Sequence, residues 1–178
     1  MNVFEIIDRY YPEPSNLRRV LLVHSWQVAE KSLEVARKHP ELHLDEMLLF
    51  DGAMLHDIGI FLTHAPGIFC EGTADYLLHG YYGGRLLRRE GLDALARICE
   101  RHTGTGLSTA DFEKRGLEVP DVGLTPETLE EKVVCYADKF YSKSSLYRLR
   151  TAEDVVRSLA KFGDEVTSRF LEWHSLFG

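Results

Sequence analysis

The chain reads Ala53-Met54-Leu55-His56-Asp57-Ile58-Gly59 where its second predicted helix ends. An apolar helical pattern precedes this stretch from Asp45 onward, and Gly59 is a residue type at which helices commonly end. His56 and Asp57 therefore place two ionisable side chains directly behind an apolar helix. Burying an imidazole and a carboxylate costs free energy unless a cation pairs with them. This segment predicts a helical protein with a polar site in its core.

Helical patterns continue outward from this segment in both directions. The predicted helices run from Ser15 to about His39, from Asp45 to Gly59, from about Ala74 to Glu90, from about Leu92 to His102, from Thr125 as N-cap through Phe140, and from Thr151 toward Trp173. Glycine and proline mark irregular stretches over Thr63–Gly72 and Thr103–Gly123. Apart from residues 133–135, no run combines β-branched residues with strict alternation. We therefore predict an all-α fold.

The composition is that of an ordinary globular protein, because 44% of the residues are hydrophobic and 28% are charged. At 178 residues the chain is expected to form one domain over residues 1–178, with a motif-bearing core over about 17–143 and a C-terminal helix over about 151–176. Its 21 Lys and Arg against 28 Asp and Glu give a formal net charge of −7. That balance argues against a nucleic-acid polymer or an anionic membrane as partner, and it leaves local basic pockets possible.

The sequence also predicts a cytoplasmic protein. Its apolar runs are too short to span a bilayer, and the early acid Glu5 does not fit the positively charged start of a signal peptide. Cys70, Cys99 and Cys135 form no CxxC pair, so we expect reduced thiols. The oligomeric state stays open.

Ionisable residues interrupt apolar helix faces at further positions. His24 lies on the apolar face of the first predicted helix, His79 opens the third, and His102 ends the fourth in register with its apolar residues. Asp138 follows the most apolar stretch of the helix that carries it. Taken singly, each of these residues is best explained as a hydrogen-bonded core residue. Together with His56 and Asp57 they favour a metal centre, which offsets the cost of burying all of them.

The chemistry of this set restricts the metal. Imidazole nitrogens and carboxylate oxygens suit Fe, Mn, Zn, Co or Ni, and they do not suit the all-oxygen sites of Mg²⁺ or Ca²⁺. We therefore expect one or two divalent transition metal ions, with Fe or Mn favoured and Zn, Co or Ni also compatible.

The order of these residues resembles that of a known family, the HD-domain metal-dependent phosphohydrolases. The resemblance rests on His24, then His56-Asp57-Ile58-Gly59, then Asp138, each on a predicted helix, and it covers about residues 17 to 143. His79 and His102 look like the additional ligands of the binuclear branch, which includes the HD-type diadenosine tetraphosphate hydrolases. The chain departs from many relatives by having Ile60-Phe61 where a basic residue follows the HDIG turn. Residues 80–83 also differ from the GYP signature of cyclic-di-GMP phosphodiesterases, which disfavours that activity.

The resemblance implies an HD-type helical bundle and a role for each residue of the pattern. His24, His56, Asp57 and Asp138 would hold the first metal, and Asp57 would also bridge to a second metal held by His79 and His102. Asp57 would thereby be a catalytic residue. The implied reaction is hydrolysis of a phosphoester or phosphoanhydride in a small molecule, with a nucleotide as the favoured substrate.

A phosphate substrate also needs cationic contacts. The basic residues nearest in sequence are Lys139 beside Asp138, Arg101 beside His102, and Lys143. Lys139 is the preferred candidate and is also expected to assist catalysis by contacting the phosphate. The competing interpretation pairs Lys139 with a surface acid, and solvated helix surface is at least as good an explanation for Arg101 and Lys143.

Two other functions are compatible with the same residues. One is a di-iron HD-fold oxygenase, whose activity would require oxygen and reduced iron. The other is a regulatory HD domain that binds a nucleotide without releasing a product. The complete set of metal-ligand residues argues against the regulatory domain, because binding alone needs no hydrolytic metal.

Overall fold

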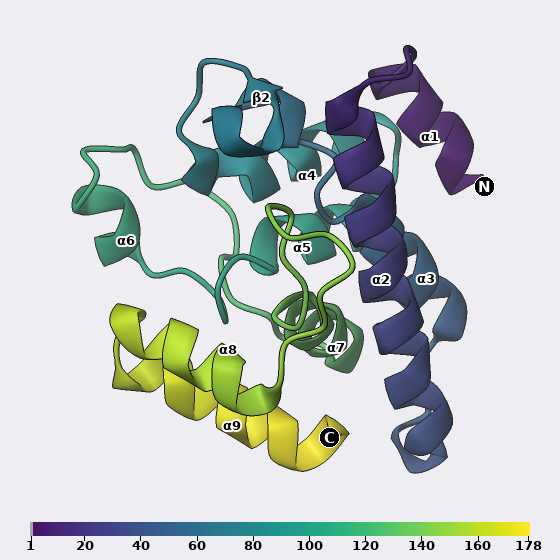
Figure 1. Ribbon diagram of the computed structural model, residues 1–178, viewed down its shortest axis with the longest axis vertical. Coiled ribbons are helices and arrows are strands. Elements are labelled where there is room, and N and C mark those ends of the chain that lie inside the picture. Colours follow the sequence, from purple (N-terminus) through teal and green to yellow (C-terminus); the bar gives the residue numbers. More distant parts are fainter. Residues whose placement is uncertain (1) are drawn as a thin grey trace.

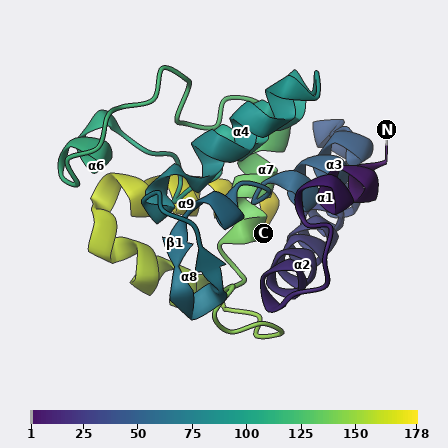
Figure 2. The same ribbon diagram turned by 90° about the horizontal axis from the view of Figure 1, so that it is seen from above.

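The computed structural model describes residues 2–178 as a bundle of helices with one very small sheet (Figures 1 and 2). The helices are α1 Val3–Tyr10, α2 Asn16–Lys38, α3 Glu46–Leu55, α4 His79–Arg89, α5 Asp93–Arg101, α6 Thr109–Glu113, α7 Leu129–Asp138, α8 Ala152–Leu159 and α9 Asp164–Phe177. Strands β1 His64–Ala65 and β2 Cys70–Glu71 pair antiparallel, with His64 opposite Glu71. The all-α prediction is confirmed.

Local capping explains where the central helices begin. The Ser15 hydroxyl accepts a hydrogen bond from the backbone N–H of Arg18 at the start of α2. The Asp45 carboxylate accepts from the first turn of α3, and Thr128 forms a reciprocal capping box with Glu131 at the start of α7. Each cap satisfies backbone N–H groups that have no partner inside their own helix.

The core forms where α2, α3, α4, α5 and α7 meet. α2 packs against α3 and α7, and α4 packs against α5. α7 lies at the centre of the bundle in Figure 1. α8 and α9 lie side by side in both views, and α9 covers α7 through the buried Phe170 and Phe177, whose rings pack against Tyr136. Within residues 2–178, no helix is long and apolar enough to cross a membrane.

Several predicted boundaries are wrong. α7 begins at Leu129 behind Thr128, three residues later than the predicted start behind Thr125, because Thr128 has Glu131 at the position that completes a capping box. The predicted C-terminal helix is interrupted at Gly163, whose φ of 116° is incompatible with a continuing helix. Helices α1 and α6 were not predicted, and the predicted loop Thr63–Gly72 contains the two strands.

The end of α3 lies unusually close to α4, and Gly59 permits this approach. A Cβ atom at Gly59 would stand 2.4 Å from the backbone N of Gly83 and 2.4 Å from the carbonyl O of His79. Real Cβ atoms do not approach backbone atoms so closely, so the two segments could not keep this distance with a larger residue. The HDIG turn and the first turn of α4 are thereby held against each other.

We expect Gly59→Ala to lower the free energy of unfolding by about 2 kcal/mol, because the added methyl group overpacks a contact between two backbones. Gly67→Ala is the matched control, since a Cβ there would meet nothing within 4 Å. Chemical denaturation of both variants checks the difference. Equal stability of the two variants would show that the close approach is not a constraint.

Candidate metal centre

Six ionisable side chains from five helices converge in the interior. His24 comes from α2, His56 and Asp57 from the end of α3, His79 from the first turn of α4, His102 from the residue after α5, and Asp138 from the last residue of α7. All six are buried. Five of them form two groups whose possible ligand atoms lie within 4.8 Å of one another, His24–His56–Asp57 and Asp57–His79–His102, and Asp138 lies beside the first. Asp57 belongs to both groups.

The first group has the spacing of ligands around one ion. Asp57 Oδ2 lies 3.3 Å from His24 Nε2 and 3.1 Å from His56 Nε2. Asp138 Oδ1 lies beside this group, 2.8 Å from His24 Nε2 and 3.6 Å from His56 Nε2. Ligands that bind one ion at about 2.1 Å stand roughly 3–3.5 Å apart. Two imidazole nitrogens and Asp57 Oδ2 have this spacing, and Asp138 is the candidate for a fourth ligand.

The second group uses the other oxygen of Asp57. Oδ1 lies 3.3 Å from His79 Nε2 and 3.4 Å from His102 Nε2, and the two imidazole nitrogens are 3.0 Å apart. The two oxygens of one carboxylate thus face two separate groups of imidazole nitrogens.

Backbone carbonyl groups orient three of the four imidazoles. Nδ1 of His56 donates to the carbonyl O of Ala53 at 2.6 Å, and Nδ1 of His79 donates to that of Tyr76 at 2.6 Å. His102 Nδ1 donates to the carbonyl O of Cys99 at 2.8 Å. Because a carbonyl only accepts, the proton must lie on Nδ1, and the Nε2 lone pair is directed into the cluster. Histidines that bind a metal through one ring nitrogen typically donate a hydrogen bond from the other in this way.

The electrostatics of the cluster also fit a bound cation. Burial lowers the pKa of His24 to about 4 and that of His102 to about 3, which favours the neutral, metal-binding form of both imidazoles. Burial acts to lower the pKa of His56 as well, but the negative charges of Asp57 and Asp138 outweigh it and raise that pKa to about 9, so these carboxylates favour a positive charge at His56 Nε2, which a metal ion supplies in place of a proton. Within residues 2–178, Asp57 Oδ1 accepts no hydrogen bond of normal geometry, and Oδ2 is paired with the Lys143 ammonium. The donor set and the unsatisfied Oδ1 fit divalent transition metal ions.

Residues 21–142 match the HD domain family. The chain belongs to this family. The HD-domain resemblance of the sequence is confirmed at the level of the family, and HD domains bind divalent metals, in agreement with the buried cluster. The assignment to the binuclear branch stays a prediction.

The HD domain described here is similar to several archaeal proteins. A Picrophilus torridus protein named tRNA (cytidine(56)-2'-O)-methyltransferase is 35% identical over 111 residues, which are 62% of this chain and 29% of that protein. A Thermoplasma volcanium protein of the same name is 33% identical over 138 residues, covering 77% and 36%. An uncharacterized Methanocaldococcus jannaschii protein is 33% identical over 141 residues, covering 78% and 74%. The chain spans about a third of the length of the two methyltransferase-named relatives.

Among solved structures, the chain is similar in fold to the HD domain of the Listeria monocytogenes phosphodiesterase PgpH. The TM-score is 0.57 at 20% identity to the crystal structure of that domain in complex with cyclic-di-AMP, covering 97% of this chain and 85% of that chain. A second crystal structure of the same domain gives a TM-score of 0.55 at 19% identity, covering 96% and 85%. The predicted HD-type helical domain is thereby confirmed.

The six buried residues His24, His56, Asp57, His79, His102 and Asp138 form what we call the HD cluster. Two lysines contact its carboxylates. Lys143 Nζ lies 2.7 Å from Asp57 Oδ2, and Lys139 Nζ lies 2.6 Å from Asp138 Oδ2. Lys139 also donates to the carbonyl O of His102 at 3.2 Å. Burial acts to lower the pKa of Lys143, but the charge of Asp57 outweighs it and holds that pKa well above its usual range. Lys139 therefore pairs with Asp138 at the cluster, and not with an acidic residue on the surface.

Arg101 does not join the cluster. Its side chain is buried, and Nη1 lies 2.8 Å from Glu127 Oε2 and 3.3 Å from Glu131 Oε2. The structure therefore removes Arg101 from the candidate substrate contacts, because two carboxylates already neutralise its charge. Lys143, for which solvated surface was an equally good expectation, lies closest to Asp57.

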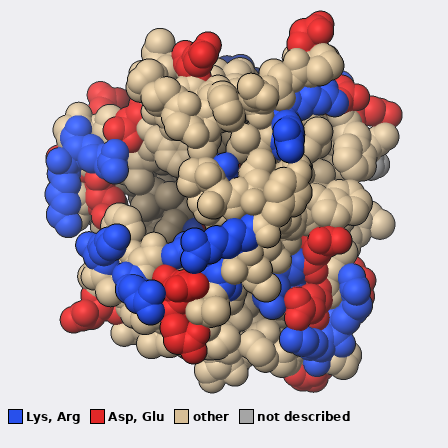
Figure 3. All heavy atoms as spheres, in the orientation of Figure 1, with Lys and Arg blue, Asp and Glu red and all other residues tan. Residues whose placement is uncertain are grey.

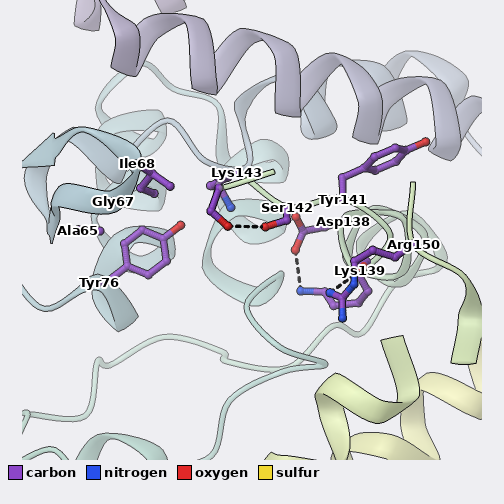
Figure 4. Close-up of a pocket in the computed structure, with 11 residues that line it drawn as sticks. Ala65, Gly67, Ile68, Tyr76, Asp138, Lys139, Tyr141, Ser142, Lys143 and Arg150 are labelled. Atoms are coloured by element: carbon purple, nitrogen blue, oxygen red, sulfur yellow. Dashed lines mark hydrogen bonds and ion pairs between the residues drawn. The ribbon is translucent and has the colours of Figure 1, made fainter. Parts of the chain in front are cut away.

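A cavity of about 370 Å³ opens beside the cluster (Figure 4). Asp138, Lys139 and Lys143 line it together with Ala65, Gly67, Ile68, Tyr76, Tyr141, Ser142, Ser144 and Arg150. Sequence reasoning missed Tyr76 and Arg150. Tyr76 stacks on the His79 ring at 4.5 Å between centroids, and no periodic signal marks it because it lies in a short turn ahead of α4.

We expect removal of metal to lower the melting temperature, because an ion that binds only the folded state stabilises that state. Protein reloaded with Mn²⁺ at about one hundred times the dissociation constant should gain about 2.7 kcal/mol of stability. Differential scanning calorimetry measures the shift, and Asp57→Asn should show a much smaller one. An identical melting temperature with and without Mn²⁺, in protein that contains no metal, would contradict this assignment.

Proposed function

We propose that this HD domain is a metal-dependent phosphohydrolase that cleaves a phosphoester or phosphoanhydride bond in a small molecule, with nucleotides as the favoured class. The observation that carries the proposal is the pair of buried ligand groups sharing Asp57 at a cavity lined by Lys139, Lys143 and Arg150. Buried carboxylates and imidazoles attract divalent metal, and the neighbouring cations suit an anionic phosphoryl group.

The surface supports a small molecule over a nucleic-acid polymer. On the face shown in Figure 3, basic side chains are interspersed with acidic ones, and a hollow opens to the left of the centre. A polymer of phosphates is bound through a continuous basic surface, and the net charge of −7 opposes such binding.

We further propose that two metal ions occupy the centre, with Fe or Mn favoured and Zn, Co or Ni also compatible. His24, His56, Asp57 and Asp138 hold the first ion, and His79 and His102 with the second oxygen of Asp57 hold the other. When bound, such ions polarise a phosphoryl group and lower the pKa of water. Asp57 fixes the relative position of both ion sites, because its two oxygens cannot move independently.

The other side chains position the substrate. Lys139 and Lys143 extend toward the cavity from opposite sides of Asp138 in Figure 4, and both carry an ammonium group at the carboxylates of the cluster. Each can donate a hydrogen bond to a phosphoryl oxygen whose negative charge grows during the reaction. The ring of Tyr76 covers His79 and excludes water from that side of the second ligand group.

A phosphate-release screen tests the activity itself. Protein purified without chelators is analysed for metal and then assayed with nucleoside mono-, di- and triphosphates and with dinucleoside polyphosphates. We expect metal-dependent release of phosphate or a shorter nucleotide. Activity that requires oxygen and reduced iron would identify an oxygenase, and nucleotide binding without any product would identify a regulatory domain; either result contradicts the proposal.

The number of metal ions can be counted by variants. We expect His79→Ala and His102→Ala each to lower the metal content by about one ion per chain and to retain the first ion, whereas Asp57→Ala loses both. His64→Ala serves as the control, since His64 is exposed and lies outside the cluster. Elemental analysis makes the count. Full metal content in both His79→Ala and His102→Ala would establish a centre with one ion.

For the phosphate contacts, we expect Lys139→Met and Lys143→Met each to reduce kcat/KM for phosphate substrates by roughly ten- to a thousandfold, because each removes a cation from the reacting group. Lys132→Met is the matched control, because Lys132 lies on the same helix as Asp138 and outside the cavity. Metal content is measured in parallel. Wild-type turnover in Lys139→Met with unchanged metal would assign that lysine a structural role only.

A further inference from the structure

A second cavity adjoins the one at the metal centre. It also measures about 370 Å³ and is lined by Ser142, Ser145, Arg148, Arg150, Asp154 and Ser158. Ser142 and Arg150 line both cavities, so the loop between α7 and α8 forms a wall that the two cavities share. Figure 4 places Arg150 next to Lys139, on the side of Asp138 opposite Tyr76.

The guanidinium groups of this loop keep their charge uncompensated. Arg150 is half-buried and donates to the carbonyl O of Lys139 at 3.3 Å and to that of Asp154 at 3.0 Å. These two carbonyl groups are neutral, so they hold the Arg150 side chain in place without neutralising its charge. Among residues 2–178, no carboxylate forms an ion pair with Arg150 or with the exposed Arg148.

The one acidic side chain lining the second cavity is engaged elsewhere. Asp154 Oδ2 accepts from the backbone N–H of Thr151 at 3.3 Å as part of the cap of α8, and Oδ1 lies 3.4 Å from Arg157 Nη1. Hydroxyl groups of Ser142 and Ser145 add hydrogen-bond donors to the lining. In a chain with a net charge of −7, three hydroxyls meet at this one cavity with two guanidinium groups that no carboxylate of residues 2–178 pairs.

We propose that Ser142, Ser145, Arg148 and Arg150 form an arginine subsite, which binds a second phosphoryl group of the substrate while the scissile one lies at the metal centre. The inference rests on the proposed function and narrows its substrate to compounds with at least two phosphoryl groups. A planar guanidinium fork matches two phosphate oxygens, and Arg is preferred where such a group must be recognised in a fixed orientation. A substrate with a single phosphoryl group leaves the arginine subsite empty.

Equilibrium binding tests this inference without requiring turnover. Mn²⁺-loaded protein is titrated calorimetrically with adenosine 5′-monophosphate, adenosine 3′,5′-bisphosphate and adenosine 5′-(α,β-methylene)diphosphate, and chromatography checks that each compound stays intact. We expect at least one of the two-phosphate compounds to bind about tenfold more tightly than the monophosphate, because it adds charge-assisted hydrogen bonds. Arg148→Ala should abolish this advantage and change the affinity for the monophosphate by less than about twofold.

Matched variants distinguish the loss of the arginine subsite from the loss of one positive charge elsewhere on the protein. Arg89→Ala removes another exposed, unpaired guanidinium, at the end of α4 and outside both cavities, and should retain the advantage in full. Arg150→Lys should weaken it, because an ammonium does not reproduce the guanidinium fork. Equal affinities for one and two phosphoryl groups, an advantage that survives Arg148→Ala, or no nucleotide binding would each overturn the inference. Tight two-phosphate binding without hydrolysis would instead support the arginine subsite and contradict the proposed hydrolase.

Discussion

The structure depends on one buried carboxylate, that of Asp57. Its Oδ2 faces His24 and His56, and its Oδ1 faces His79 and His102, all at 3.1–3.4 Å. An ionised carboxylate in the interior is costly unless cations surround it. The helices that bring the imidazoles to Asp57 are therefore stabilised together by whatever cation the centre holds. This shared dependence links the fold of the HD domain to its metal chemistry.

The ends of helices fix the orientation of the imidazole rings in the HD cluster. His56, His79 and His102 each lie where a helix begins or ends, and each donates Nδ1–H to a carbonyl oxygen three residues earlier. The backbone, which is already ordered by the helix, thereby fixes both the ring orientation and the tautomer. Close approach at Gly59 then sets the distance between two of these helix ends. Few additional side chains are needed to hold the ligands.

The loop that follows Asp138 gives the centre its cationic surroundings. Lys139, Lys143 and Arg150 all lie between Asp138 at the end of α7 and the start of α8. In the proposed function, the buried cluster accounts for the reaction and this loop for contacts with the substrate. The TM-score of 0.57 to the PgpH domain shows a common fold, and at 20% identity the likeness shows the fold alone.

The sequence by itself predicted most of the helices and the six residues that meet in the interior, because a side chain on the apolar face of a helix must point inward, as His24 does. It failed where local signals competed, as at Thr125 against Thr128 and at Gly163. Only the tertiary structure decided that Arg101 turns to glutamates and that Lys143 reaches Asp57. An irregular loop has no repeat that fixes its direction, so its path depends on the packing of distant segments.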